Sequence, residues 1–178
     1  EGEDFSGRQG TWIGYSTDEV LDKATELARI EVDKRNPDES DELKDIIANQ
    51  VASGALRYFM LNASPDRKIT FKWEEALDFQ GDASPYLQYS LARANRILER
   101  VKHTSKKKVN LNILVEDAEF ELVKAISRFP QEVLEVVQSM KKDVWGTSFA
   151  SNKITAFGYK LATLFSKFYD SCLVLKAE

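Results

Sequence analysis

The stretch from Gly81 to Arg93 constrains the fold of this chain most, because it predicts a turn that leads directly into a helix. A Gly-Asp pair opens the turn, and Ser84 is a favourable N-cap. Pro85 suits the first helical position, where the backbone N–H has no intrahelical partner to lose. We expect the helix to continue to about Val101.

The predicted helix carries two stripes, because both its apolar residues and its arginines recur at three- and four-residue steps. The apolar stripe consists of Leu87, Leu91, Ala94 and Leu98, and the cationic one of Arg93, Arg96 and Arg100. We expect the apolar stripe to be buried. The arginines are then either a solvated surface or a surface that binds phosphate groups.

A longer run of residues around this helix resembles a known family. Residues 71–89 fit the pattern F-x-W-x-x-A-L-x-F-x-G-x-x-x-P-Y-L-Q-Y. By this pattern the chain resembles the class I arginyl-tRNA synthetases, in which such a segment leads into a helical anticodon-binding domain. Residues 47–59 and the Phe168-Tyr169 pair are also similar to that family. The resemblance implies an all-helical fold and a tRNA-binding function.

A short loop near the N-terminus extends the resemblance. Residues 5–10 are rich in small side chains, and they are either a plain flexible loop or a loop whose backbone N–H groups and Arg8 hold an anion. The loop resembles the "KMSKS" loop of the family, commonly M-S-G-R-K-G, which stabilises developing negative charge with fixed positive charge. Gln9 replaces a lysine of that pattern. The ATP-binding residues that the resemblance implies are Ser6, Gly7, Arg8, Gln9 and Gly10.

Hydrophobic periodicity and capping signals predict the remaining helices. Their expected ranges are 17–34, 41–61, 73–77, 116–129 and 131–142, and a last helix carries apolar residues at helical spacing from Ile154 to Cys172. We expect Pro130 to separate two of them and residues 143–152 to form a loop, with Ser151 or Asn152 capping the last helix. No stretch alternates strands with helices as a parallel sheet requires. The predicted fold class is therefore all-α, a bundle of about six helices.

Particular apolar residues of these helices are expected to face the core of the bundle. In the second helix Ile46 is among them, and the helices after residue 116 repeat apolar side chains at helical spacing. The residues in that later part are Phe120, Val123, Ile126, Phe129, Val133, Val136, Val137 and Met140.

The resemblance also implies a division of the chain. Residues 1–15 are expected to be the KMSKS-like loop at the edge of a catalytic domain, residues 16–80 connecting helices, and residues 81–178 the anticodon-binding bundle. Family members continue into a further helix, so we expect the bundle to be truncated at its C-terminal end.

Composition restricts the class of protein further. A hydrophobic content of 43% with 30% charged residues is typical of a soluble globular chain, and no apolar run approaches the ~20 residues that span a bilayer. The single cysteine, Cys172, cannot form an internal disulfide. We therefore expect a cytoplasmic protein without membrane contact. The net charge of −4 argues against nucleic-acid binding unless the cations are clustered.

Two further groups of residues are candidates for RNA binding. Lys106, Lys107 and Lys108 form the one dense cationic run, which is either a solvated connector or a contact for RNA phosphates. Trp145 and Phe149 lie in a polar loop, where aromatic rings either stack on unpaired bases or hold the loop against the core. No cysteine or second histidine accompanies His103, so no metal site is expected.

Our hypothesis is that the chain is the tRNA-binding part of an arginyl-tRNA synthetase. The resemblance then implies that the full-length enzyme ligates arginine to arginine tRNA with ATP and Mg²⁺. We expect the chain alone to be inactive and to bind neither cofactor, since the family's H-x-G-H segment has no counterpart here. We also expect it to be a monomer. The alternative is a helical protein-protein interaction module without RNA binding, which predicts an exposed apolar patch. A third hypothesis, that the chain is an enzyme by itself, is remote, because the sequence has no cluster of Cys, His or paired carboxylates that could be catalytic.

Overall fold

The computed structural model describes residues 16–64, 67, 69–100, 111–143, 146–172 and 174. The chain divides into two compact units. The first consists of residues 1–61 and 66–85, and the second of residues 62–65 and 86–178. No helix in the described ranges is both long and apolar enough to cross a membrane.

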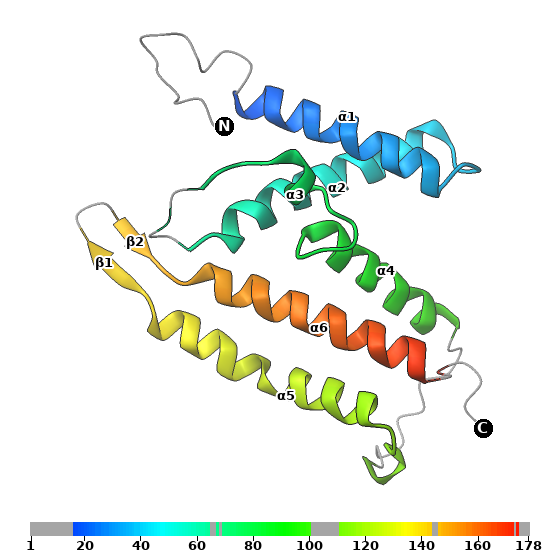
Figure 1. Cartoon of the computed structure of the whole chain (residues 1–178), viewed down its shortest axis with the longest axis vertical. Coiled ribbons are helices and arrows are strands. Elements are labelled where there is room, and N and C mark those ends of the chain that lie inside the picture. Colours follow the sequence, from blue (N-terminus) through cyan, green and yellow to red (C-terminus); the bar gives the residue numbers. More distant parts are fainter. Residues whose placement is uncertain are drawn as a thin grey trace. The chain divides into compact units, whose positions relative to one another are not determined.

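The first unit is built on a helical hairpin, in which α1 (Thr17–Arg35) packs against α2 (Asp41–Asn62) (Figure 1). The α1 helix begins with a capping box, because Ser16 Oγ accepts from the Glu19 N–H (3.3 Å) and the Glu19 carboxylate accepts from the Ser16 N–H (2.9 Å). Small side chains fill the contact between the helices, which lets the two backbones approach closely. The buried core consists of Ala24, Ala28, Val32, Ala48 and Ala52.

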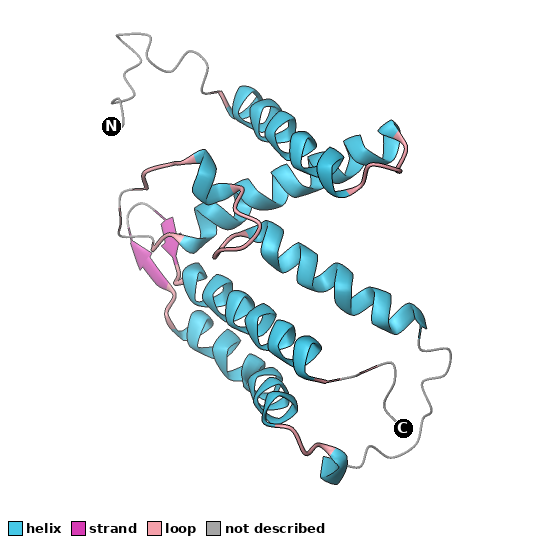
Figure 2. Cartoon of the chain, turned by 45° about the vertical axis from the view of Figure 1, so that its right-hand side comes forward, coloured by secondary structure: helices cyan, strands magenta, loops and turns pink. Residues whose placement is uncertain are grey.

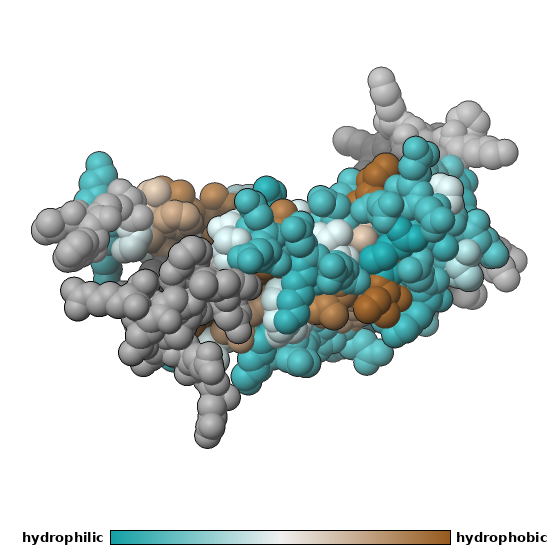
Figure 3. All heavy atoms as spheres, turned by 90° about the horizontal axis from the view of Figure 1, so that it is seen from above, coloured by the Kyte–Doolittle hydropathy of each residue, from teal (hydrophilic) through white to brown (hydrophobic). Residues whose placement is uncertain are grey.

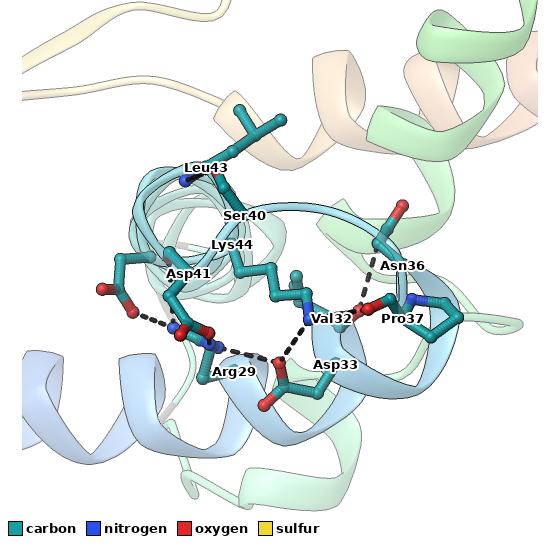
Figure 4. A network of polar contacts seen from close by, with 10 residues as sticks. Arg29, Val32, Asp33, Asn36, Pro37, Ser40, Asp41, Leu43 and Lys44 are labelled. Carbon is teal, nitrogen blue, oxygen red and sulfur yellow. Dashed lines mark hydrogen bonds and ion pairs between the residues drawn. The ribbon is translucent and has the colours of Figure 1, made fainter.

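Charged side chains join the two helices near their connection (Figure 4). The Arg29 guanidinium bonds the carboxylates of Asp33 (3.1 Å), Asp41 (2.7 Å) and Asp45. The buried Lys44 ammonium donates to the Pro37 carbonyl (3.2 Å) and lies 3.6 Å from Asp33. Every buried charge of this network therefore has a partner, as burial of a charge requires.

A short helix and a turn complete the first unit. The α3 helix (Trp73–Ala76) brings Trp73 under the Lys23 ammonium (5.1 Å to the ring centroid). In the following turn, the Asp78 carboxylate accepts from the Gln80 N–H (2.7 Å). A Cβ atom at Gly81 would overlap an Asp78 carboxylate oxygen, so a larger residue here would displace the Asp78 side chain.

The second unit contains three long helices. They are α4 (Ser84–Arg100), α5 (Asp117–Gln138) and α6 (Ser151–Ser171), and Figures 1 and 2 show α6 lying between the other two. A 3₁₀ turn, η1 (Leu111–Ile113), precedes α5. The all-α prediction with about six helices is confirmed.

The α4 and α6 helices pack through aromatic and small residues. The Tyr86 hydroxyl bonds the Ser166 hydroxyl (3.2 Å), and the Tyr86 and Tyr159 rings lie 5.6 Å apart. Gly158 faces Leu87 so closely that a Cβ atom would lie 3.0 Å from Leu87 Cδ2. These contacts fix one side of α4 against α6.

The prediction that Pro130 ends a helix was wrong, because α5 runs through it without interruption. Proline removes one intrahelical hydrogen bond, but here the flanking residues still pack on α6. The Phe129 and Phe157 rings lie 5.6 Å apart, and the Glu135 carboxylate pairs with the Lys153 ammonium (3.4 Å). The packing of α5 on α6 therefore stabilises the continuous helix by more than the loss of one hydrogen bond at Pro130 destabilises it.

The predicted loop over residues 143–152 was also wrong. Two short antiparallel strands, β1 (Lys141–Asp143) and β2 (Gly146–Ser148), connect α5 to α6. Their base is held because Ser139 Oγ accepts from the Ala150 N–H (3.1 Å). The cap of α6 is Ala150 rather than Ser151 or Asn152.

Several apolar residues expected in the core are exposed. On α4, Leu91 is 62% and Leu98 63% exposed, although Leu87 of the same stripe packs against Gly158 on α6. Ile46 on α2 is exposed as well. The exposed residues on α5 and just after it are Phe120, Val123, Ile126, Phe129, Val133, Val137 and Met140, whereas Val136 is buried. Figure 3 shows one face of the molecule, on which hydrophobic patches interrupt the hydrophilic surface.

Candidate nucleic-acid interface

Arg93 is held between two tyrosine rings. Its guanidinium carbon lies 4.7 Å from the ring centroid of Tyr89, one turn earlier on α4, and 4.4 Å from that of Tyr169 on α6. The guanidinium also donates to the Tyr89 hydroxyl (2.9 Å). Each cation–π contact of this kind contributes roughly 0.5–1 kcal/mol at an exposed site. Arg93 is therefore fixed in place, and it is only partly exposed.

Arg96 and Arg100 follow on the same helix and are both exposed. Neither forms an ion pair or a hydrogen bond with any residue that the structure describes. Spacings of three and seven residues place them on the same side of α4 as Arg93. The three arginines thus form a cationic face on which Arg93 is held by two rings while Arg96 and Arg100 pair with no described residue, and we call them the α4 arginine face.

Of the other predicted site residues, the structure describes only Phe149. Phe149 follows β2 and is 41% exposed, so its ring is accessible. The predicted ATP-binding residues Ser6, Gly7, Arg8, Gln9 and Gly10 lie outside the described residues, as do Lys106, Lys107, Lys108 and Trp145. Their assignments stay predictions.

Sequence reasoning missed Tyr89 and Tyr169 as parts of the arginine face. Tyr89 is 51% and Tyr169 41% exposed, so both rings border the surface that carries Arg93. The position of Tyr89 four residues before Arg93 could have indicated the first contact. No sequence signal indicated the second, because Tyr169 reaches Arg93 only through the packing of α6 on α4.

The charge of the chain is unevenly distributed. Residues 86–178 contain fifteen Lys or Arg and ten Asp or Glu, a net charge of +5. Residues 1–85 contain ten Lys or Arg and nineteen Asp or Glu, a net charge of −9. The acidic average therefore comes from the first part of the chain, and the part that carries the arginine face has the sign that phosphate binding requires.

Comparison with known proteins connects this bundle to a class of RNA-binding domain. Residues 87–178 match the family described as the DALR anticodon binding domain, and the chain belongs to this family. The match begins in the first turns of α4 and includes the whole arginine face.

The particular proteins to which the whole chain is similar are arginine--tRNA ligases. It is 43% identical to that of Thermococcus kodakarensis and 41% identical to that of Pyrococcus abyssi, in each case over 98% of the chain. The chain spans 27% of the length of each of these relatives. The resemblance to arginyl-tRNA synthetases is thus confirmed.

Solved structures agree with this assignment. The chain is similar to the arginyl-tRNA synthetase of Thermus thermophilus with a TM-score of 0.72 and 31% identity, over 88% of this chain and 24% of the other. The enzyme of Plasmodium falciparum has a TM-score of 0.70 at 20% identity, over 91% of this chain and 28% of the other, which supports the fold alone.

Proposed function

We propose that this chain binds arginine tRNA through the α4 arginine face, as the anticodon-binding part of an arginine--tRNA ligase. The observation that carries the proposal is the position of Arg93 between Tyr89 and Tyr169, beside two exposed arginines that pair with no described residue. Such a surface offers exposed cations for phosphate groups and a guanidinium with flanking rings on which unpaired bases can stack. An anticodon loop presents both groups.

The activity of the full-length protein belongs to the same proposal. It would form arginyl-tRNA from arginine, ATP and tRNA, with Mg²⁺ accompanying the nucleotide. The bundle would contribute by holding the tRNA while a catalytic domain acts on the acceptor end, and residues 6–10 would contact the nucleotide. A cytoplasmic location and a monomeric state are part of the proposal.

A second candidate function is a contact with another protein. It is favoured by the exposed apolar side chains of α5, of which Phe120 (60%) and Ile126 (54%) are examples. Apolar contacts depend weakly on salt, whereas phosphate contacts release counterions and are lost as salt rises. Salt dependence therefore separates the two functions.

The experiment is a titration of labelled arginine tRNA with the chain at two salt concentrations. We expect binding that weakens steeply with salt, and a smaller slope for the variant that carries Arg96→Glu and Arg100→Glu. Each lost phosphate contact lowers the logarithmic salt slope by about 0.7 to 0.9. Unchanged affinity in this variant would exclude the α4 arginine face as the binding surface.

A further inference from the structure

The α6 helix carries a row of three lysines that the proposed α4 surface does not include. Lys153, Lys160 and Lys167 are spaced by seven residues and are all exposed. Seven residues correspond to about two turns and ~10.5 Å along a helix. The row therefore follows one side of α6.

The three lysines differ in their surroundings. The Lys153 ammonium pairs with the Glu135 carboxylate (3.4 Å). Lys167 borders a surface hollow between α5 and α6 that is rich in carboxylates. The acidic residues of that hollow are Glu116, Asp117, Glu121 and Asp170. Lys160 has no ion pair within the described part of the chain and is not part of the hollow, so it is the lysine of the row most available to an anion.

On α5, Arg128 is a cation that pairs with no described residue and lies at a level of the helix similar to that of Lys160 on α6. The Phe129–Phe157 ring contact (5.6 Å) sets this register. Arg128 directly precedes Phe129, and Lys160 lies one turn after Phe157, so both cations flank the same contact. Arg128 is exposed and forms no ion pair with another described residue.

The neighbouring charges on α5 leave Arg128 available. Lys124, one turn before it, pairs with the Glu121 carboxylate (3.4 Å). Glu132, one turn after it, is partly exposed and forms no ion pair with Arg128. Two cations without a described partner, on helices whose axes lie about 8–10 Å apart, can contact phosphates of one RNA backbone.

We propose that Arg128 and Lys160 form a second phosphate-binding patch on the α5–α6 side of the bundle, which contacts the same tRNA as the α4 arginine face. This inference rests on the proposed function. The net charge of +5 over residues 86–178 favours a polyanion over an acidic protein segment, because the RNA backbone offers phosphates at regular intervals to both surfaces.

The test compares two double variants with the same change in charge on the same two helices. The first carries Arg128→Glu and Lys160→Glu, and the control carries Lys124→Glu and Lys167→Glu. Affinity for arginine tRNA is measured at several salt concentrations, and circular dichroism checks that each variant keeps its helix content. We expect the first variant to bind at least tenfold more weakly, with a logarithmic salt slope smaller by about 1.4 to 1.8. The control should change affinity less than about threefold, because its lysines already lie beside carboxylates.

Equal losses in the two variants would show a general effect of charge and would overturn the patch. Retained affinity in the first variant would overturn the patch alone, provided that the Arg96→Glu and Arg100→Glu variant still loses affinity. A chain that binds no tRNA even at low salt would overturn the patch together with the proposed function.

Discussion

The guanidinium carbon of Arg93 on α4 lies 4.4 Å from the ring centroid of Tyr169 on α6. This contact joins two helices that are far apart in the sequence, and it holds a cation at the surface in a defined orientation. A planar guanidinium can contact both tyrosine rings and keep them in place for a base to stack on, whereas a lysine ammonium cannot hold both in this way.

Arg93→Lys should therefore weaken tRNA binding although it preserves the charge. We expect a loss of roughly 1–3 kcal/mol of binding free energy, the range for one base stacked on an aromatic ring, because the two rings lose the contact that holds them. Tyr169→Phe is the matched control, because it keeps the ring that faces Arg93. Equal affinity of the wild type and the Arg93→Lys chain would show that Arg93 acts only through its charge.

The close approach of Gly158 to Leu87 gives a test of how α4 packs on α6. In Gly158→Ala, a Cβ atom 3.0 Å from Leu87 Cδ2 requires a small shift of a flexible side chain, and the better helix propensity of alanine, about 1 kcal/mol, offsets this cost. We expect little change in the thermal midpoint.

A larger residue at the same position cannot be accommodated in this way. Gly158→Leu should destabilise the second unit by roughly 1–3 kcal/mol, as overpacking does. Thermal unfolding followed by circular dichroism measures both variants. A Gly158→Leu chain as stable as the wild type would mean that α4 and α6 do not pack at this point.

The pH dependence of stability should include a contribution from Glu31. A hydrogen bond from Lys34 (3.3 Å), and then one from Arg35, lowers the pKa of the Glu31 carboxyl below its ordinary value of 4.5. Since the unfolded state binds the proton more readily, the stabilisation is present above about pH 4.5 and is lost as the pH falls through the lower pKa of the folded state.

Glu31→Gln should accordingly lower the thermal midpoint at neutral pH and have a smaller effect at about pH 3. The change should be modest, because both cations are substantially exposed and water screens the interaction. Thermal midpoints of the two chains at several pH values provide the measurement. A difference between the chains that stays constant down to pH 3 would contradict this account.

The sequence predicted the helices better than it predicted their packing. Capping residues and periodicity are local, so α1, α2 and α4 begin and end within about one residue of their expected bounds. Pro130 misled the prediction, because the rule that proline ends a helix takes no account of a neighbour such as α6 that stabilises both halves. The short strands around residues 141–148 carry no strong strand signal, and their pairing depends on where α5 and α6 bring the chain.

The candidate site was predictable in part for the same reason. The spacing of Arg93, Arg96 and Arg100 follows from one helix, and their exposure or partial exposure fits the expected cationic face. The contribution of Tyr169 could not be found, because it arises from tertiary packing. The burial of Leu91 and Leu98 was predicted wrongly, since periodicity indicates an apolar side of a helix but not which side a neighbour covers.

The central claim is that this bundle recognises the anticodon region of arginine tRNA. The most direct measurement compares the affinity of the chain for the isolated anticodon stem-loop of that tRNA with its affinity for a minihelix of the acceptor stem, at the same salt concentration. We expect the stem-loop to bind more tightly and the variant with Arg96→Glu and Arg100→Glu to lose most of the difference. Equal binding of the two RNAs, or tighter binding of the acceptor minihelix, would contradict it.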